Sequence, residues 1–166
     1  MSIKNFGIIV GGQLGSLLAV AAKKLNINTT IYCDDVDAPA QNFCNKFICG
    51  KYDDKLKMQE FLKEIDVITY EFENIPYETL NEMNKVKPVL PKPSVNRLIQ
   101  HRIAEKDFVN KLNIRTTRYA SIENKSDMEP LGDFLPGILK TTTMGYDGKG
   151  QYPIKKIGEI NKLNID

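Results

Sequence analysis

The stretch Phe6-Gly7-Ile8-Ile9-Val10-Gly11-Gly12-Gln13-Leu14-Gly15 carries the strongest indication of the fold. Its first half, residues 6–10, is mostly apolar and predicts a buried strand. Apolar residues then recur at helical spacing from 14 to 25, which predicts a helix directly after the glycines. A strand, a glycine turn and a helix in this order are typical of the first unit of a parallel α/β sheet.

The same alternation of strand and helix continues to about residue 95. The expected elements are strands at 29–33, 46–49 and 66–70, and helices at 53–65 and from Pro76, taken as the first helical residue. A last short strand is expected within 87–93, followed by an extended linker. Together these elements predict an α/β domain over residues 1–95, with a parallel sheet covered by helices on both faces.

The second segment, residues 96–166, has weaker patterns. The expected elements are helices at 95–99, 103–112 and 125–131, and strands at 117–120, 137–141 and 152–155. The last two strands flank a turn-rich loop at 142–150 and therefore predict a hairpin. The segment is either a small appendage of the first domain or the beginning of a larger domain. We favour the second, because too few elements are available to cover the hairpin.

Composition places the chain among soluble globular proteins. It has 166 residues, of which 42% are hydrophobic and 27% are charged. Lys plus Arg number 23 against 21 Asp plus Glu, and the net charge of +2 gives no long-range attraction to nucleic acid or anionic membranes. Cys33, Cys44 and Cys49 do not have the number or spacing of a disulfide scaffold or a zinc site. Without an apolar membrane span or a signal peptide, the chain is expected to be cytoplasmic.

The glycine turn at 11–15 is a candidate anion site. Glycines there let backbone N–H groups approach an anion at the helix N-terminus. The dinucleotide-binding pattern G-x-G-x-x-G has Val10 at its first position, so two alternatives stay open. One is a tight turn in which the glycines only allow close packing. The other is an NAD enzyme, with Asp34 or Asp35 at the end of the second strand on the ribose.

A second candidate is the run Thr69-Tyr70-Glu71-Phe72-Glu73-Asn74-Ile75-Pro76. Two carboxylates and an amide follow a strand at its carboxyl end, where ligands bind in open α/β sheets. Glu71 and Glu73 alternate with aromatic residues, so the two carboxylates are expected to share a face. The alternative is that Glu73 or Asn74 caps the helix that begins at Pro76. For Glu73 we favour a functional role.

A third candidate is the loop from Lys140 to Gln151. Its glycines, Gly145, Gly148 and Gly150, form a flexible backbone cradle, and Lys140 and Lys149 add positive charge. Backbone N–H groups and ammonium groups together suit a polyphosphate. The loop is not a P-loop, because it has no GK[ST] and no helix follows it directly. A bare hairpin with a glycine-rich tip is the alternative.

In their order and spacing these motifs resemble one family, the N5-carboxyaminoimidazole ribonucleotide synthetases of the ATP-grasp superfamily. The resemblance rests on Gly12-Gln13-Leu14-Gly15, Thr69 to Pro76, Gln100-x-Arg102-x-x-x-Lys106, and Lys140 with Gly145 to Gln151. It covers essentially the whole chain but only about the N-terminal half of the family's length. It implies a Rossmann-like pre-ATP-grasp domain over 1–95 and the first part of an ATP-grasp domain over 96–166.

The resemblance also implies a reaction and its participants. The family uses ATP and bicarbonate to carboxylate 5-aminoimidazole ribonucleotide in purine biosynthesis, with Mg²⁺ on the nucleotide. The implied ATP contacts are Arg102, Lys140, Gly145, Tyr146, Asp147, Gly148, Lys149, Gly150 and Gln151, with catalytic roles for Asp147 and Lys149. The implied substrate contacts are Gln13, Leu14, Glu73, Tyr146 and Asp147. The Mg²⁺ ligands are expected in the family's C-terminal half, so none is assigned in this chain. The partner is expected to be a second copy or a separately encoded C-terminal half.

The sequence departs from the family at several ligand positions. Val10 and Met144 replace usual glycines, and Ser16 and Thr142 replace usual arginines. We expect weakened anion binding and, with the family's downstream half absent, a fragment: a decaying frame, a split gene or a cut piece. The alternatives to an active synthetase are therefore a non-catalytic nucleotide-binding remnant and half of a split enzyme. The single histidine, His101, is expected to lie on a helix surface or to cap a helix.

Overall fold

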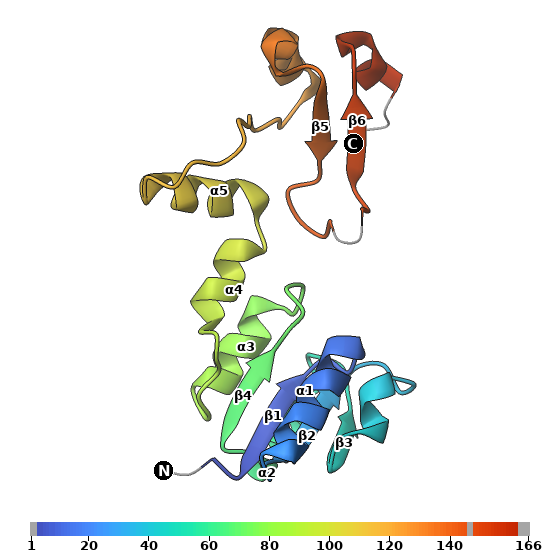
Figure 1. The fold of residues 1–166 in the computed structure, drawn as a ribbon, viewed down its shortest axis with the longest axis vertical. Coiled ribbons are helices and arrows are strands. Elements are labelled where there is room, and N and C mark those ends of the chain that lie inside the picture. Colours follow the sequence, from blue (N-terminus) through green and yellow to red (C-terminus); the bar gives the residue numbers. More distant parts are fainter. Residues whose placement is uncertain (1–2, 146–147, 163–166) are drawn as a thin grey trace. The chain divides into compact units, whose positions relative to one another are not determined.

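The computed structural model describes residues 3–145 and 148–162. These form two compact units, residues 1–97 and residues 98–166 (Figure 1). In the part of the chain described, no helix is both long and apolar enough to cross a bilayer.

Unit 1 is built on a four-stranded parallel sheet with strand order β3-β2-β1-β4. Its strands are β1 (Asn5–Ile9), β2 (Asn28–Cys33), β3 (Lys46–Cys49) and β4 (Val67–Tyr70). Its helices are α1 (Gln13–Lys24), the short η1 (Pro39–Asn42), α2 (Lys55–Glu64), α3 (Tyr77–Asn84) and the start of α4 (Pro93–Ile99). The predicted strands and helices of this unit are confirmed to within two residues at most ends.

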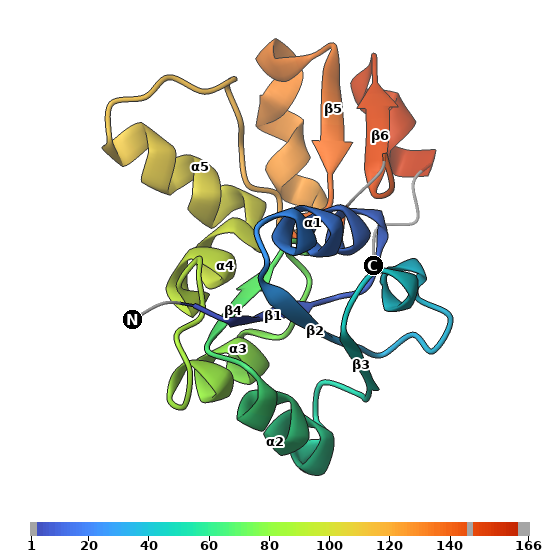
Figure 2. The same cartoon turned by 60° about the horizontal axis from the view of Figure 1, so that its bottom comes forward.

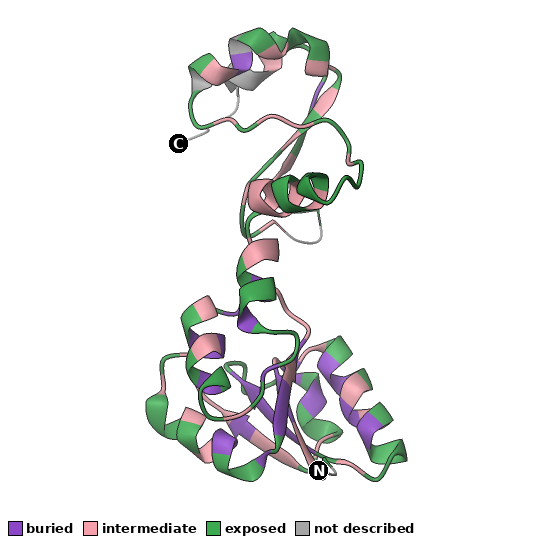
Figure 3. Ribbon diagram, turned by 90° about the vertical axis from the view of Figure 1, so that its left-hand side faces the viewer, coloured by how far each residue is buried: buried purple, intermediate pink, exposed green. Residues whose placement is uncertain are grey.

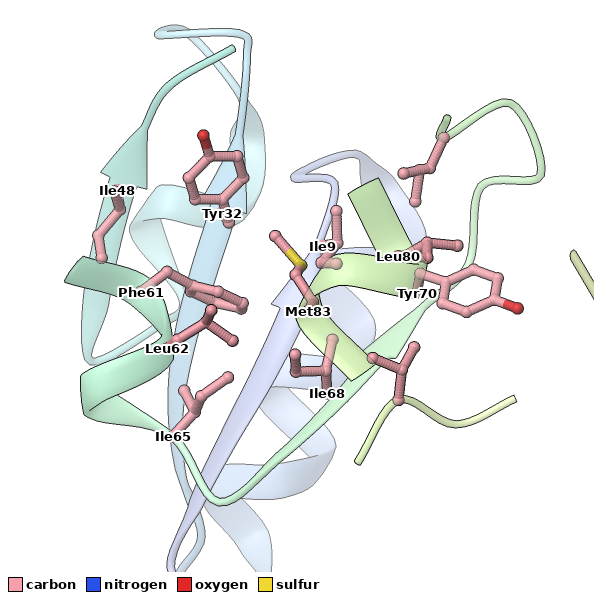
Figure 4. Close-up of a cluster of buried hydrophobic side chains, with 12 residues drawn as sticks. Ile9, Tyr32, Ile48, Phe61, Leu62, Ile65, Ile68, Tyr70, Leu80 and Met83 are labelled. Atoms are coloured by element: carbon pink, nitrogen blue, oxygen red, sulfur yellow. The ribbon is translucent and has the colours of Figure 1, made fainter. Parts of the chain in front are cut away.

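Helices cover both faces of this sheet, as predicted (Figure 2). Alternation along the strands sends neighbouring residues to opposite faces. Ile8 of β1 packs with Ala19 of α1, while Ile9 packs with Phe61 of α2 and Leu80 of α3. Figure 4 shows this second cluster, in which the helix side chains lie over those of the strands. Ile8 and Ile9 of β1 are therefore both buried, one on each face of the sheet.

The strand predicted within 87–93 is wrong as a full strand. The structure has a single parallel bridge between Ile68 and Val89. The Ile68 N–H donates to the Pro88 carbonyl at 2.8 Å, and the Leu90 N–H donates to the Ile68 carbonyl at 2.9 Å. Prolines at 88 and 91 have no N–H to extend the pairing. Pro76 is also displaced by one position, since it is the cap residue of α3 rather than its first helical residue.

Unit 2 contains the end of α4, α5 (Arg102–Lys111) and a hairpin of β5 (Gly137–Lys140) and β6 (Gln151–Ile154). Two 3₁₀ segments accompany them, η2 (Lys125–Phe134) and η3 (Ile157–Lys162). The antiparallel hairpin confirms the prediction. Its buried core, among the residues described, consists of Met128 and Ile154, and α5 has no buried residue (Figure 3).

The strand predicted at 117–120 is wrong, because α5 holds this segment through side chains. The Lys106 ammonium donates to the Thr117 carbonyl at 3.2 Å, and the Tyr119 hydroxyl donates to the Asp107 carboxylate at 2.5 Å. His101 caps α5, where its Nδ1 accepts from the Ala104 N–H at 3.4 Å, and its predicted capping role is confirmed.

Unit 1 should depend on the α2 face of its core. Phe61 is fully buried, so Phe61→Ala should lower the free energy of unfolding by about 3–5 kcal/mol. Leu56 lies on the same helix but is 79% exposed, and Leu56→Ala should cost less than about 0.5 kcal/mol. Urea unfolding measures both, and equal losses would contradict this assignment of the core.

Candidate functional site

The strand order of unit 1 reverses between β1 and β4. From β1 the chain moves outward to β2 and β3, and then returns to the other side of β1 as β4. In open α/β sheets, ligands bind beyond the carboxyl ends of the strands at such a reversal. The segments that leave these two strands are 10–12 and 71–74, both singled out from the sequence.

The structure brings these two segments together. A Cβ atom on Gly12 would lie 3.7 Å from Oε1 of Glu71, so the carboxylate lies against the turn. Gly12 is also the cap residue of α1, whose first turn has no acidic residue and no side-chain cap. The free N–H groups and the dipole at this helix end favour an anion or a hydrogen-bond acceptor.

Glu71 is the residue that sequence reasoning left out of the substrate contacts. Its carboxyl is half-buried, and burial raises its pKa. A carboxyl with a raised pKa beside the end of β4 can hold or accept a proton from a bound amine. The sequence feature that could have identified Glu71 was its position directly after β4, which is closer to the reversal point than the position of Glu73.

The glycines of the turn serve two purposes. A Cβ on Gly11 would lie 2.7 Å from the Ala38 Cβ, and one on Gly15 would lie 2.7 Å from the Val10 carbonyl oxygen. The close-packing alternative is therefore correct for Gly11 and Gly15. Gly12 alone has room, and its bare backbone faces Glu71.

Val10 has a backbone conformation that favours glycine. Its φ is +80°, and its N–H donates to the Tyr32 carbonyl at 2.8 Å. A β-branched residue in this region is strained. The backbone therefore has the shape that a glycine would adopt, while the sequence supplies valine.

The remaining candidates of unit 1 surround the reversal point. Gln13 and Leu14 are the first two residues of α1 and are exposed, and Glu73 is half-buried in the loop after β4. The Asn74 Nδ2 is buried and has no hydrogen-bond partner among the described residues. Because Pro76 is the cap residue of α3, the capping alternative for Asn74 is wrong. A buried amide without a partner is costly unless a ligand oxygen accepts from it.

In unit 2, the β5–β6 hairpin carries the other candidates. Lys140 ends β5 on its exposed side and is the register partner of Gln151. The Thr141 N–H donates to the Gly150 carbonyl at 2.9 Å, which closes the base of the loop. Lys149 and Gly148 are exposed on the loop. Tyr146 and Asp147 lie outside the described residues.

Arg102 fixes one side of this loop. Its Nε donates to the Thr141 carbonyl at 3.3 Å, and its Nη2 donates to the Gly145 carbonyl at 3.5 Å. Its own backbone N–H donates to the Thr142 carbonyl at 2.8 Å. The start of α5 is thereby joined to the beginning of the loop.

Among the described loop residues, three have positive φ: Met144 at +58°, Gly148 at +79° and Gly150 at +63°. Gly148 has open space around it, whereas a Cβ on Gly150 would collide with the Thr141 side chain. Gly145 is also tight, since its Cβ would lie 2.9 Å from the Thr141 Oγ1. Thr141 therefore sets how closely the two ends of the loop approach.

In the described part of the chain, no three His, Cys, Asp or Glu side chains are grouped so that they could hold a metal ion. The described side chains therefore supply no ligand set for Mg²⁺.

Comparison with known proteins identifies the family to which this fold belongs. Residues 3–100 match the model of the ribonucleotide synthetase preATP-grasp domain. The chain belongs to this family. Residues 107–164 match the ATP-grasp domain, so the fold predicted from the sequence is confirmed: a pre-ATP-grasp domain and part of an ATP-grasp domain.

Individual relatives point the same way. N5-carboxyaminoimidazole ribonucleotide synthase of Brucella melitensis is 36% identical over 162 residues, which is 96% of this chain and 45% of that protein. The bifunctional purine synthesis protein purC/E of Dictyostelium discoideum is 40% identical over 151 residues, 89% of this chain and 15% of that protein. The resemblance stated from the motifs is confirmed.

A similar solved structure is N5-carboxyaminoimidazole synthetase from Staphylococcus aureus complexed with ADP. It is 31% identical, has a TM-score of 0.89, and matches 96% of this chain and 43% of its own. The enzyme from Aspergillus clavatus in complex with ADP and 5-aminoimidazole ribonucleotide shares the fold at 23% identity, with a TM-score of 0.81. This chain spans less than half the length of each of these relatives.

Burial of Glu71 predicts a specific pH dependence. Its folded-state pKa lies above the unfolded-state value, so the native protein loses stability as pH rises through that interval. Glu71→Gln should therefore stabilise unit 1 at neutral pH, and this gain should shrink as pH falls to about 4. Urea unfolding across the pH range tests it. Glu78→Gln, in the exposed first turn of α3, should instead destabilise slightly.

Strain at Val10 predicts an unusual order of stability. Glycine tolerates positive φ and alanine does not, so Val10→Gly should be more stable than Val10→Ala by about 1 kcal/mol. At Val36, an exposed loop residue without positive φ, alanine should be the more stable variant. Thermal unfolding compares the four variants. The same order at both positions would contradict strain at residue 10.

Proposed function

We propose that this chain carries the N-terminal portion of an N5-carboxyaminoimidazole ribonucleotide synthetase. The reaction is the ATP- and bicarbonate-dependent carboxylation of 5-aminoimidazole ribonucleotide. The observation that carries the proposal is that one chain combines two features and matches both domain models of this family. The features are the reversal point at Gly12 and Glu71 and the glycine-rich loop between β5 and β6.

The hairpin loop supports the ATP side of the proposal. Lys140 and Lys149 are exposed cations at the two ends of a glycine-rich backbone. Phosphoryl transfer needs cations and N–H donors on the charge of the transferred group, and this loop supplies both. Arg102 already donates to two loop carbonyls, so we assign it first to holding the loop and second to ATP. Catalytic roles for Asp147 and Lys149 stay part of the proposal.

The reversal point supports the ribonucleotide side. Gln13 and Leu14 begin α1, whose N-terminus favours an anion, and Glu71, Glu73 and Asn74 line the facing loop. Glu71 is placed to accept a hydrogen bond from an amine, and the buried Asn74 amide is placed to donate to an oxygen. An aminoimidazole with a sugar phosphate has groups of each kind.

A second candidate is a chain that binds nucleotide but does not turn over alone. Few of the described residues of unit 2 are buried, and the chain spans 45% of the Brucella synthase. Such a chain is either a remnant or half of a split enzyme. An NAD-dependent oxidoreductase finds no support, since residues 107–164 match the ATP-grasp domain.

The deciding measurement is ADP release from ATP, Mg²⁺ and bicarbonate, with and without 5-aminoimidazole ribonucleotide, alongside calorimetric binding of ATP. Ribonucleotide-dependent release would establish a working synthetase. ATP binding without release, followed by release once the C-terminal portion of the Brucella synthase is added, would establish a split enzyme. No ATP binding would overturn the proposal.

Loop variants make the binding measurement specific. Gly150→Ala should lower ATP affinity at least about tenfold, because its Cβ collides with the Thr141 side chain and opens the loop. Gly148→Ala has the same sign of φ but no collision, so it should have the smaller effect. Thr141→Ala should restore part of the affinity in the Gly150→Ala background. Equal effects of the two glycine variants would argue against binding at this loop.

A further inference from the structure

Two cysteines that are 16 positions apart in sequence are direct neighbours in the sheet. Cys33 ends β2 and Cys49 ends β3, and the parallel register pairs one with the other. The Gly50 N–H donates to the Cys33 carbonyl at 2.9 Å, so the pairing holds to the end of both strands. In the sequence, the number and spacing of the cysteines do not indicate this pairing.

Their side chains lie on the same face of the sheet. Cys33 belongs to the cluster that contains Ile31 and Ala19, and Phe47 of β3 packs against that cluster. Cys49 is two residues after Phe47 and therefore shares its face. Neighbouring strands are about 4.8 Å apart. Disulfides join Cα atoms that are about 4.4–6.8 Å apart, so this strand spacing falls within the Cα range, and the bond also requires the two side chains to turn toward each other.

The surroundings of the two thiols differ. Cys33 is 3% exposed and burial raises its pKa, whereas Cys49 is half-buried. Cys49 is therefore the more accessible thiol to a reagent from solution, and Cys33 is its register partner on the neighbouring strand. Among the described residues, β3 is the outermost strand of the sheet and pairs with β2 alone, so it can make the small adjustment that a bond needs.

We propose that Cys33 and Cys49 form a reversible disulfide, a redox-responsive site at the carboxyl edge of the sheet. With a peroxide, the Cys49 thiolate attacks one oxygen of the O–O bond, which gives a sulfenic acid and releases water or an alcohol. The Cys33 sulfur then attacks the sulfenic sulfur, the S–S bond forms and water leaves. Two thiols lose two electrons and two protons, which the peroxide takes up.

The disulfide acts on the turn that carries Gly12. A Cβ on Gly11 would lie 3.3 Å from the Cys33 Sγ, so this thiol packs directly against the turn. A bond to Cys49 draws the Cys33 sulfur away from Gly11 and removes that contact. The oxidised state thereby loosens the β1–α1 turn while it ties β2 to β3. This inference does not depend on the proposed reaction.

The test starts from the reduced chain treated with hydrogen peroxide, followed by alkylation and mass spectrometry without reduction. Trypsin leaves Cys33 and Cys44 on one peptide, residues 25–46, and Cys49 on another, residues 47–51. Variants are therefore needed to assign the bridge. Cys44 is the matched control, since it is half-buried near the same cluster and its thiol donates to the Gln41 carbonyl at 3.6 Å.

The expected result is a bridge between the two peptides in the wild type and in Cys44→Ser, but not in Cys33→Ala or Cys49→Ser. Dithiothreitol should reverse it, and the bridged chain should melt about 5 °C higher than the reduced one. A bridge that persists in Cys33→Ala, or oxidation of Cys49 beyond sulfenic acid without a bridge, would overturn the proposal. Cys49→Ser changes a half-buried side chain, so it provides the readout even if Cys33→Ala folds poorly.

Discussion

Everything in unit 1 depends on β1 being enclosed on four sides. It pairs with β2 on one edge and β4 on the other, and α1 and α2 cover its two faces. Gly7 makes the second covering possible, because a Cβ there would lie 2.7 Å from Ile65 and 2.8 Å from Phe61. A strand with no free edge and no free face is reachable only at its ends, and its carboxyl end is the one that meets the loop after β4. The approach to the reversal point follows from this enclosure.

Sequence patterns predicted the parallel sheet because strands that are buried on both faces consist of nearly continuous apolar residues. Ile8-Ile9 and Ile31-Tyr32 put apolar groups on both sides of their strands, which local patterns reveal. The strand predicted within 87–93 was wrong because its prolines have no N–H to donate to a neighbouring strand, whatever the apolar pattern of the segment. The 117–120 strand failed because long side chains on α5 captured that backbone, and such tertiary contacts leave no periodic signal.

The candidate site divides in the same way. Gly12 and the carboxylates after β4 were found from position alone, since ligands gather at strand ends. The proximity of Glu71 to Gly12 and the pairing of Cys33 with Cys49 required the register of strands far apart in sequence. The resemblance supplied residue roles in the hairpin loop that no local pattern could. It also identified Val10 and Met144 as replaced glycines, and both have the positive φ that glycine tolerates best. At both positions the backbone therefore has a conformation that favours glycine, although the residue is not glycine.

The hairpin of unit 2 has a consequence for the life of the polypeptide in a cell. β5 and β6 pair only with each other among the described residues, and Ile138 on β5 is 59% exposed. A ribbon with two open edges and an apolar surface is a template for strands of other molecules. It is also a substrate for chaperones and proteases that survey incompletely covered chains. Protection of these two strand edges therefore matters for unit 2 as well as the packing of its small core.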